Sequence, residues 1–172
     1  MVLVSHAREV DYRVGILTVS TSRWKRHGPL RGVSSIPDDD ESGKLIAKEM
    51  PNVVDYALVP DVVEEIRSAL LQMLCNVDVC IVTGGTGLSP SDVTIEAIEP
   101  LYAKKIEGFG EIFRRLSYEE IGFDAILSRA SAGIVMQKVV FCLPGSVKAV
   151  RLGLKIIKEV VAHVLTHVRG LA

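Results

Sequence analysis

The chain has 172 residues, of which 48% are hydrophobic and 24% are charged, as in an ordinary soluble protein with one substantial core. Its formal net charge is −1, so no global field favours nucleic acid or an anionic membrane as a partner. Residues 1–12 carry Arg8, Glu9 and Asp11 and lack the apolar run of a secretory signal, and we interpret them as an N-terminal extension. No stretch approaches the roughly 18 apolar residues of a spanning helix.

The cysteines indicate a reducing compartment. Cys75, Cys80 and Cys142 are odd in number, show no CxxC spacing and have apolar neighbours. We therefore expect buried thiols rather than metal ligands or disulfides, and a cytoplasmic protein.

The N-terminal part predicts a strand, a long loop, a helix and a second strand. Residues 13–19 are apolar and rich in β-branched types, which predicts a buried strand. Residues 20–39 contain glycines, prolines and serines and predict a long loop. Two hypotheses fit its basic residues: a solvated, mobile charged segment, or a flap that gathers a phosphorylated ligand. Residues 40–50 predict a helix with acidic residues in its first turn, and residues 53–59 a strand.

The remaining chain continues to alternate. Helices are expected from residue 60 to about 74, over 93–98 and 109–121, and over 147–168; strands are expected at 77–83 and 139–143. Alternation of this kind predicts an α/β fold with a mostly parallel sheet and helices on both faces. No repeat or linker divides the chain, so residues 1–172 are expected to form one domain.

The strongest chemical signal is a glycine loop that follows the strand at 77–83. It reads Thr83, Gly84, Gly85, Thr86 and Gly87. Glycines at the carboxyl end of a buried strand let backbone N–H groups approach phosphate oxygens or a base closely. A tight turn needs fewer glycines and threonines, so we favour nucleotide binding. The loop matches neither a Walker motif nor GxGxxG.

Two aspartates follow strand ends that should share one edge of the sheet. Asp61 comes after the strand at 53–59, and Asp92 comes after the glycine loop. Each can be a helix N-cap. Alternatively, the two carboxylates hold Mg²⁺ together with phosphate oxygens. Without a metal they would repel a phosphorylated substrate, so the phosphate hypothesis implies a divalent ion.

Three weaker features remain open. Residues 128–133 combine Ser128, Arg129 and Gly133 in an expected polar loop that suits a phosphate or a pterin edge. Residues 144–146 end a strand and begin a helix, so their amides can face an anion. His163 and His167 have the i, i+4 spacing of a metal chelate, but no third ligand is evident, so we favour a polar helix face over a metal site.

Taken together, these segments resemble the MoaB/Mog family of molybdenum-cofactor biosynthesis, and the MoaB branch in particular, from about residue 14 to residue 149. The order and spacing of the segments carry the resemblance. They are Thr18-Val19-Ser20, Asp40-Glu41-Ser42-Gly43, Val59-Pro60-Asp61, Thr83-Gly84-Gly85-Thr86-Gly87, Asp92-Val93-Thr94, Glu107-Gly108-Phe109-Gly110-Glu111, Ser128-Arg129 with Ala132-Gly133, and Leu143-Pro144-Gly145-Ser146.

The resemblance implies a three-layer α/β/α molybdopterin-binding domain that forms a trimer or a hexamer, with the downstream molybdate-insertion enzyme as a candidate partner. It implies Mg²⁺-dependent adenylylation of molybdopterin by ATP, with release of pyrophosphate. Asp61 and Asp92 would be catalytic metal ligands, and the glycine loop would bind the nucleotide. Contacts to the pterin and its phosphate would come from Ser20, Ser42, Gly43, Ser128, Arg129, Gly133, Pro144, Gly145 and Ser146.

Two positions depart from the family pattern. Thr21 stands where many relatives have an acidic residue, and Ile95 stands where a proline is common. Some relatives also lack the aspartate that corresponds to Asp61, whereas this chain has it, which favours an enzyme. A pterin carrier without catalysis and a pyrophosphatase of the CinA type are the alternatives.

Overall fold

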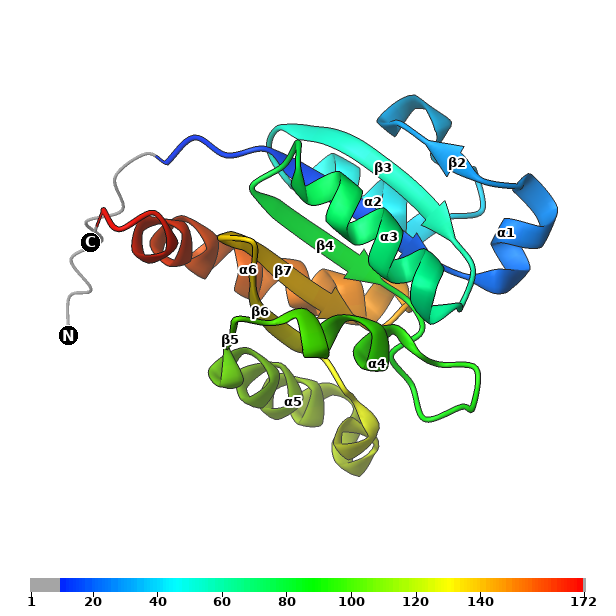
Figure 1. Cartoon of the computed structure of the whole chain (residues 1–172). Helices are drawn as coiled ribbons and strands as arrows, with labels where there is room; N and C mark the ends of the chain where they lie inside the picture. The colour runs from blue at the N-terminus through cyan, green and yellow to red at the C-terminus, as the bar shows by residue number, and fades with distance from the viewer. Residues whose placement is uncertain (1–9, 172) are drawn as a thin grey trace.

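Seven strands form one sheet in the order β2-β3-β1-β4-β7-β6-β5 in the computed structural model, which describes residues 10–171 (Figure 1). The four central strands, β3, β1, β4 and β7, are parallel. The outer strands pair antiparallel with their neighbours. The strands are β1 (Val14–Val19), β2 (Leu30–Arg31), β3 (Val53–Val59), β4 (Val79–Thr83), β5 (Lys104–Lys105), β6 (Ser131–Val135) and β7 (Lys138–Leu143).

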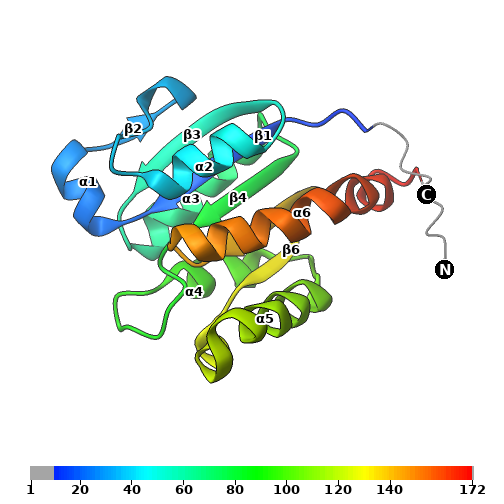
Figure 2. The same ribbon diagram turned by 180° about the vertical axis from the view of Figure 1, so that it is seen from behind.

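Helices cover both faces of this sheet, as predicted. The helices α3 (Val63–Leu74) and α4 (Thr94–Ile98) lie on the face seen in Figure 1. The opposite face, seen in Figure 2, carries α2 (Glu41–Glu49), α5 (Glu107–Ile121) and α6 (Val147–Val168). Short elements complete the chain: α1 (Thr21–His27), and the 3-10 turns η1 (Val33–Ser35), η2 (Glu99–Leu101) and η3 (Gly122–Leu127).

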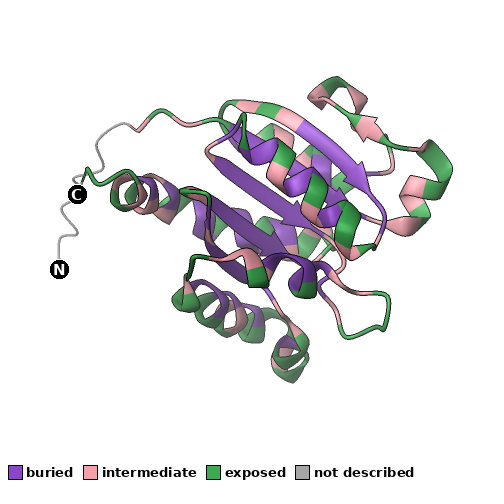
Figure 3. Cartoon of the chain, in the orientation of Figure 1, coloured by how far each residue is buried: buried purple, intermediate pink, exposed green. Residues whose placement is uncertain are grey.

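Each face of the sheet has its own hydrophobic core, because successive side chains of a strand point to opposite faces. In β1, Val14 and Ile16 pack with α2, α5 and α6, whereas Leu17 and Val19 pack with α3 and α4. Strands β1 and β4 are accordingly buried along their whole length (Figure 3). The three-layer α/β/α prediction is confirmed, and α6 buries Leu152 and Ile156 within the chain.

The segment 20–39 was expected to be an irregular loop, and that prediction is wrong. Ser20 caps α1 by accepting a hydrogen bond from the N–H of Arg23, and β2 then pairs with β3. The basic residues of α1 contact Asp39. Arg26 Nη1 lies 2.7 Å from Asp39 Oδ2, and Arg23 Nε donates to the Asp39 carbonyl at 3.1 Å. Local ion pairing therefore orders this basic segment.

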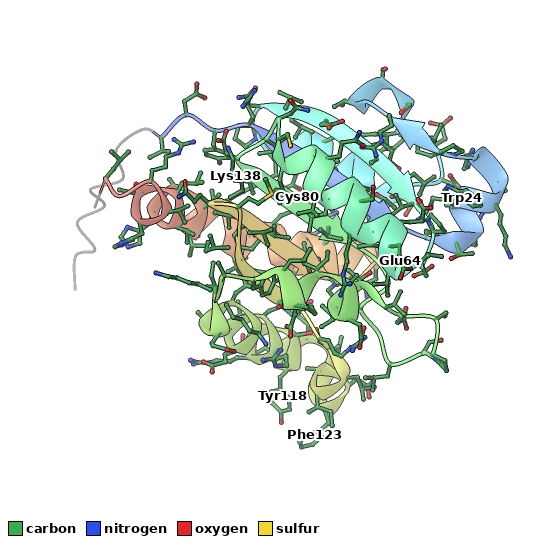
Figure 4. The ribbon with its side chains drawn as sticks, in the orientation of Figure 1. Trp24, Glu64, Cys80, Tyr118, Phe123 and Lys138 are labelled. Carbon is green, nitrogen blue, oxygen red and sulfur yellow. The ribbon has the colours of Figure 1, made fainter. Side chains whose placement is uncertain are left out.

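Two further expectations need correction. Residues 131–133 belong to strand β6 rather than to a loop, because Met136 and Gln137 adopt positive φ angles of 51° and 58° and close a hairpin to β7. Cys75 is exposed at the end of α3, whereas Cys80 and Cys142 are buried in the sheet, where Figure 4 labels Cys80. All three cysteines are free thiols.

The expected extension at residues 1–12 falls mainly on residues 1–9, which lie outside the described part of the chain. Within residues 10–171, no helix combines the length and the apolar character needed to cross a membrane.

Candidate functional site

The sheet order brings the glycine loop and both aspartates to one edge. Strand β1 lies between β3 and β4 and is parallel to both, so the segments that follow β3 and β4 emerge beside each other. Asp61 follows β3, and the glycine loop with Asp92 follows β4. The strand order changes direction at this point, which is where open α/β sheets bind ligands.

Gly84 begins the loop in a conformation that only glycine tolerates. Its φ is +97°, and a Cβ built at this position would clash with the carbonyl oxygen of Val19. The Gly84 N–H donates to the carbonyl of Leu143 at 3.1 Å, and its own carbonyl accepts from the hydroxyl of Thr94 at 2.8 Å. The first turn of the loop is therefore fixed by β1, β7 and α4 together.

Asp61 lies directly against the next glycine. A Cβ on Gly85 would come within 2.8 Å of Asp61 Oδ1. Oδ2 of the same carboxylate accepts two hydrogen bonds from Thr21, from the backbone N–H at 2.9 Å and from the hydroxyl at 2.7 Å. Thr21 thus fixes Oδ2, and Oδ1 is left facing the glycine loop.

Asp92 borders the last glycine of the loop. A Cβ on Gly87 would lie 2.6 Å from Asp92 Oδ2, which also accepts the N–H of Ser89 at 3.0 Å. Neither aspartate caps a helix, because the residues at the N-cap positions of α3 and α4 are Val62 and Val93. The N-cap alternative is wrong for both, and the two carboxylates instead flank one loop.

A cavity of about 250 Å³ opens over the glycine loop. It gathers most of the predicted nucleotide-binding residues with part of the predicted pterin-binding set. It is lined by Gly84, Gly85, Thr86, Gly87, Asp92, Leu127, Ser128, Pro144 and Gly145.

Other predicted residues support this cavity from the sides. Ser42 donates its hydroxyl to the carbonyl of Gly145 at 2.9 Å, which links α2 to the turn before α6. Thr83 is buried at the end of β4, with its hydroxyl 3.3 Å from the carbonyl of Pro144. Ser146 caps α6 by accepting the N–H of Ala149, and Gly43 donates its N–H to Asp40.

Arg129 holds the outer part of the glycine loop. Its Nε donates to the carbonyl of Thr86 at 3.0 Å and its Nη2 to the carbonyl of Gly87 at 2.7 Å. The guanidinium also pairs with Glu96 on α4, and this hydrogen bond lowers the pKa of Glu96 below its ordinary value. In this structure Arg129 shapes the loop that would meet a ligand.

Gly133 does not reach the cavity. It lies in β6 opposite Val140, and a Cβ at this position would collide with the ring of Tyr102. The close approach of that ring explains the glycine, and Gly133 is absent from the residues that line the cavity.

Three polar contacts in and near the candidate site were not anticipated from the sequence. The first is the Thr21 clamp on Asp61, which occurs where Thr21 departs from the family pattern. The second is the Thr94 hydroxyl on Gly84. The third is the fully buried Asp40, whose Oδ2 accepts from the hydroxyls of Thr18 and Tyr56, each at 2.8 Å. Burial, together with Asp40, raises the pKa of Tyr56.

The donor set fits Mg²⁺ in the presence of a phosphorylated ligand. Among residues 10–171, no three His, Cys, Asp or Glu side chains converge as a complete metal cage. Mg²⁺ is usually held by one or two carboxylates together with waters and substrate phosphates, and a carboxylate lies on each side of the loop. The arrangement therefore suits an ion that a phosphate ligand brings or completes.

The fold and this site define an α/β ligand-binding domain whose glycine loop and carboxylates lie at the carboxyl edge of a parallel sheet. Residues 15–163 match the family described as "Probable molybdopterin binding domain". The chain belongs to this family and, within it, to the MoaB/Mog proteins.

Relatives of known name support this assignment. The "Probable molybdopterin adenylyltransferase" of Methanocaldococcus jannaschii is 43% identical over 166 residues, which cover 95% of this chain and 98% of that protein. The crystal structure of "tungsten cofactor synthesizing protein MoaB from Pyrococcus furiosus" matches with a TM-score of 0.80 and 41% identity, covering 94% of this chain and 99% of that chain.

A more distant structure shares the fold alone. The protein CinA of Thermoplasma acidophilum matches with a TM-score of 0.56 and 16% identity, covering 88% of this chain and 97% of that chain. At this identity the likeness carries no argument for a pyrophosphatase.

Proposed function

We propose that this protein is a molybdopterin adenylyltransferase of molybdenum-cofactor biosynthesis. The observation that carries the proposal is the position of two carboxylates, Asp61 and Asp92, against two glycines of one loop. Relatives that align over nearly the whole chain bear the same activity in their names. The substrates would be ATP and molybdopterin.

In the proposed reaction, the terminal phosphate of molybdopterin attacks the α-phosphorus of ATP. A new P–O bond forms, the bond to the β-phosphate bridging oxygen breaks, and pyrophosphate leaves. No protein nucleophile is needed, so the protein contributes positioning and charge neutralisation. The backbone of Gly84, Gly85 and Gly87 would approach the nucleotide phosphates, because these positions have no side chain in the way.

Asp61 and Asp92 would hold Mg²⁺, which when bound neutralises charge on the phosphate oxygens. Thr21 positions Asp61 by fixing its Oδ2, so that Oδ1 stays directed to the loop. Ser128, Pro144 and Gly145 line the other side of the cavity and would face the pterin phosphate.

The test is to incubate the purified protein with molybdopterin, ATP and Mg²⁺ and to detect the adenylylated product by mass. Product should form with Mg²⁺ and be absent when the metal is chelated. Asp61→Asn and Asp92→Asn should abolish turnover with the fold intact. Asp38→Asn is the matched control. The side chain of Asp38 is fully exposed, and this substitution removes the same charge away from the glycine loop.

Turnover that survives both active-site substitutions would refute the metal assignment. Tight pterin binding without product, and without calorimetric heat from ATP and Mg²⁺, would instead indicate a pterin carrier. Cleavage of ADP-ribose would indicate a pyrophosphatase.

Three wider proposals follow from the family. We expect self-association as a trimer or a hexamer, which light scattering on the purified chain would measure; the exposed Phe123 and Ile126 beside α5 supply apolar surface for it. We also expect a cytoplasmic location, which agrees with three free cysteines, and hand-over of product to a molybdate-insertion enzyme.

A further inference from the structure

Helix α6 ends in a histidine pair that lies far from the candidate site. His163 and His167 are exposed on the last turns of the helix, whereas Ser146 at its other end borders the site. A rise of 1.5 Å per residue puts about 25 Å between Ser146 and His163 along the helix axis. Nothing in the proposed reaction uses these two rings.

The two imidazoles are in contact through their Nε2 atoms, which form a hydrogen bond. Their Nε2 atoms are 3.2 Å apart, the ring centroids are 4.6 Å apart, and the ring planes are nearly perpendicular at 89°. Two nitrogens bound to one metal ion at about 2.0–2.1 Å each are separated by about 2.9–3.4 Å for bond angles between square and tetrahedral. The nitrogen separation in this helix, which a hydrogen bond between the two rings now holds, lies within that interval.

The surroundings leave room for further ligands. The pair lines a groove of about 600 Å³ with an apolar floor that includes Ile106 and Ile134 and with the amide side chain of Gln137 at its edge. Two lysines also line it. Lys105 pairs with Glu99 at 3.0 Å, so its charge is compensated, whereas Lys104 is exposed. The free energy that a cation gains from binding the imidazoles must therefore exceed its repulsion by the charge of one lysine, Lys104.

We propose that His163 and His167 form a binding site for a divalent transition-metal ion, with Cu²⁺ bound more tightly than Ni²⁺ or Zn²⁺. Neutral imidazole suits these ions, and their affinities for nitrogen ligands follow that order. Water completes the coordination. Hard cations such as Mg²⁺ and Ca²⁺ prefer oxygen ligands and are excluded. This site is independent of the proposed adenylyltransferase activity.

The experiment titrates the full chain with Cu²⁺ alone, in a buffer without chelators, followed by calorimetry and by electron paramagnetic resonance. We expect one Cu²⁺ per chain with two nitrogen ligands. His163→Ala and His167→Ala should each weaken binding by about 100-fold, because each removes the gain from tethering two ligands. The chain contains two other histidines, and the double variant His6→Ala with His27→Ala is the matched control, with affinity unchanged.

Stability supplies a second readout, because an ion that binds only the folded chain raises its unfolding temperature. Cu²⁺ should raise this temperature in the wild type and in the control, but not in His163→Ala. Both histidines are exposed, so these variants should fold normally by circular dichroism. Equal Cu²⁺ affinity in the wild type and in the double variant His163→Ala with His167→Ala would overturn the proposal, as would loss of binding in only one single variant.

Discussion

The two halves of the glycine loop are held in different ways. The inner half, residues 83–85, is fixed by hydrogen bonds to β7 and α4 and by close contact with the Val19 backbone. The outer half, residues 86–92, is exposed from Leu88 to Ser91 and depends largely on one guanidinium, that of Arg129. The inner half is thus fixed to the sheet and to α4, whereas the outer half is a surface loop held by one polar side chain.

The largest effect is expected at Gly84, in the inner half. Gly84→Ala places a side chain at a φ of +97° and drives Cβ into the Val19 carbonyl, so we expect a loss of more than about 3 kcal/mol in the free energy of unfolding. Gly108→Ala is the matched control: it lies in α5 with no atom within 4 Å of the added Cβ, and alanine favours a helix. Urea unfolding of both variants measures the difference, and a Gly84→Ala loss below about 1 kcal/mol would contradict a fixed inner half.

The second prediction concerns the clamp on Asp61. Thr21→Val keeps the shape of the side chain but removes the hydroxyl that donates to Asp61 at 2.7 Å and accepts from its N–H at 2.9 Å. We expect kcat of the proposed reaction to fall about 10-fold to 100-fold and the Mg²⁺ requirement to rise, because Asp61 loses its orientation.

Thr21→Ser retains the hydroxyl and should restore most of the activity. Measuring kcat against Mg²⁺ concentration separates this positioning role from a loss of folded protein, which would lower the rate at every Mg²⁺ concentration alike. Equal Mg²⁺ dependence in Thr21→Val and the wild type would contradict the clamp.

The third prediction tests the outer half. Arg129→Met keeps an unbranched stem but removes the donors to the carbonyls of Thr86 and Gly87. We expect a loss of about 1–2 kcal/mol and faster amide hydrogen exchange over residues 86–92, with residues 83–85 unchanged. Arg115→Met on the exposed side of α5 is the control and should leave exchange in the loop as it is. Faster exchange spread evenly over both halves would contradict the distinction between them.

The smallest effect concerns pH. The hydrogen bond from Arg129 lowers the pKa of Glu96 in the folded chain below its ordinary value of 4.5. A carboxyl with a lowered folded-state pKa stabilises the fold above its unfolded pKa, and this contribution disappears as the pH falls through the folded value. Because Glu96 is half exposed, the wild type should exceed Glu96→Gln by only about a few tenths of a kcal/mol at pH 7.

The difference in the free energy of unfolding between the wild type and Glu96→Gln should shrink as the pH falls below 4.5. It should vanish once the pH has passed below the lowered pKa of Glu96 in the folded chain. Urea unfolding at a series of pH values measures it. A gap that persists unchanged into that acid range would show that the ion pair does not support the outer half.

The regular elements of the core could be predicted from the sequence because their signals are local. The helix at 147–168 and the strands at 53–59 and 139–143 follow from apolar periodicity and from flanking proline or glycine, and the structure places them within a residue of those bounds. Helix α1 and strand β6 could not be predicted in this way. The first depends on ion pairs with Asp39, and the second on a Met136-Gln137 turn without the usual Asn-Gly signature.

The candidate site divides in the same manner. Glycines and carboxylates after strand ends are typical of phosphate and metal sites. The position of the glycine loop and the two aspartates at one edge of the sheet could therefore be predicted from the sequence. Their supports were not, because a hydroxyl such as that of Thr21 or Thr94 acquires its role only from a partner brought up by the sheet. Arg129 was expected to contact the pterin or its phosphate. The sequence could not show that its guanidinium already donates hydrogen bonds to carbonyls of the glycine loop.

The position of β1 between β3 and β4 has a consequence for how the protein folds. Its pairing with each neighbour is parallel and joins segments far apart in the chain, such as Val14 with Val53 and with Val79. Such pairings close large loops and form slowly. Asp61 and the glycine loop with Asp92 follow β3 and β4, so they come together at one edge only after both pairings of β1 have formed.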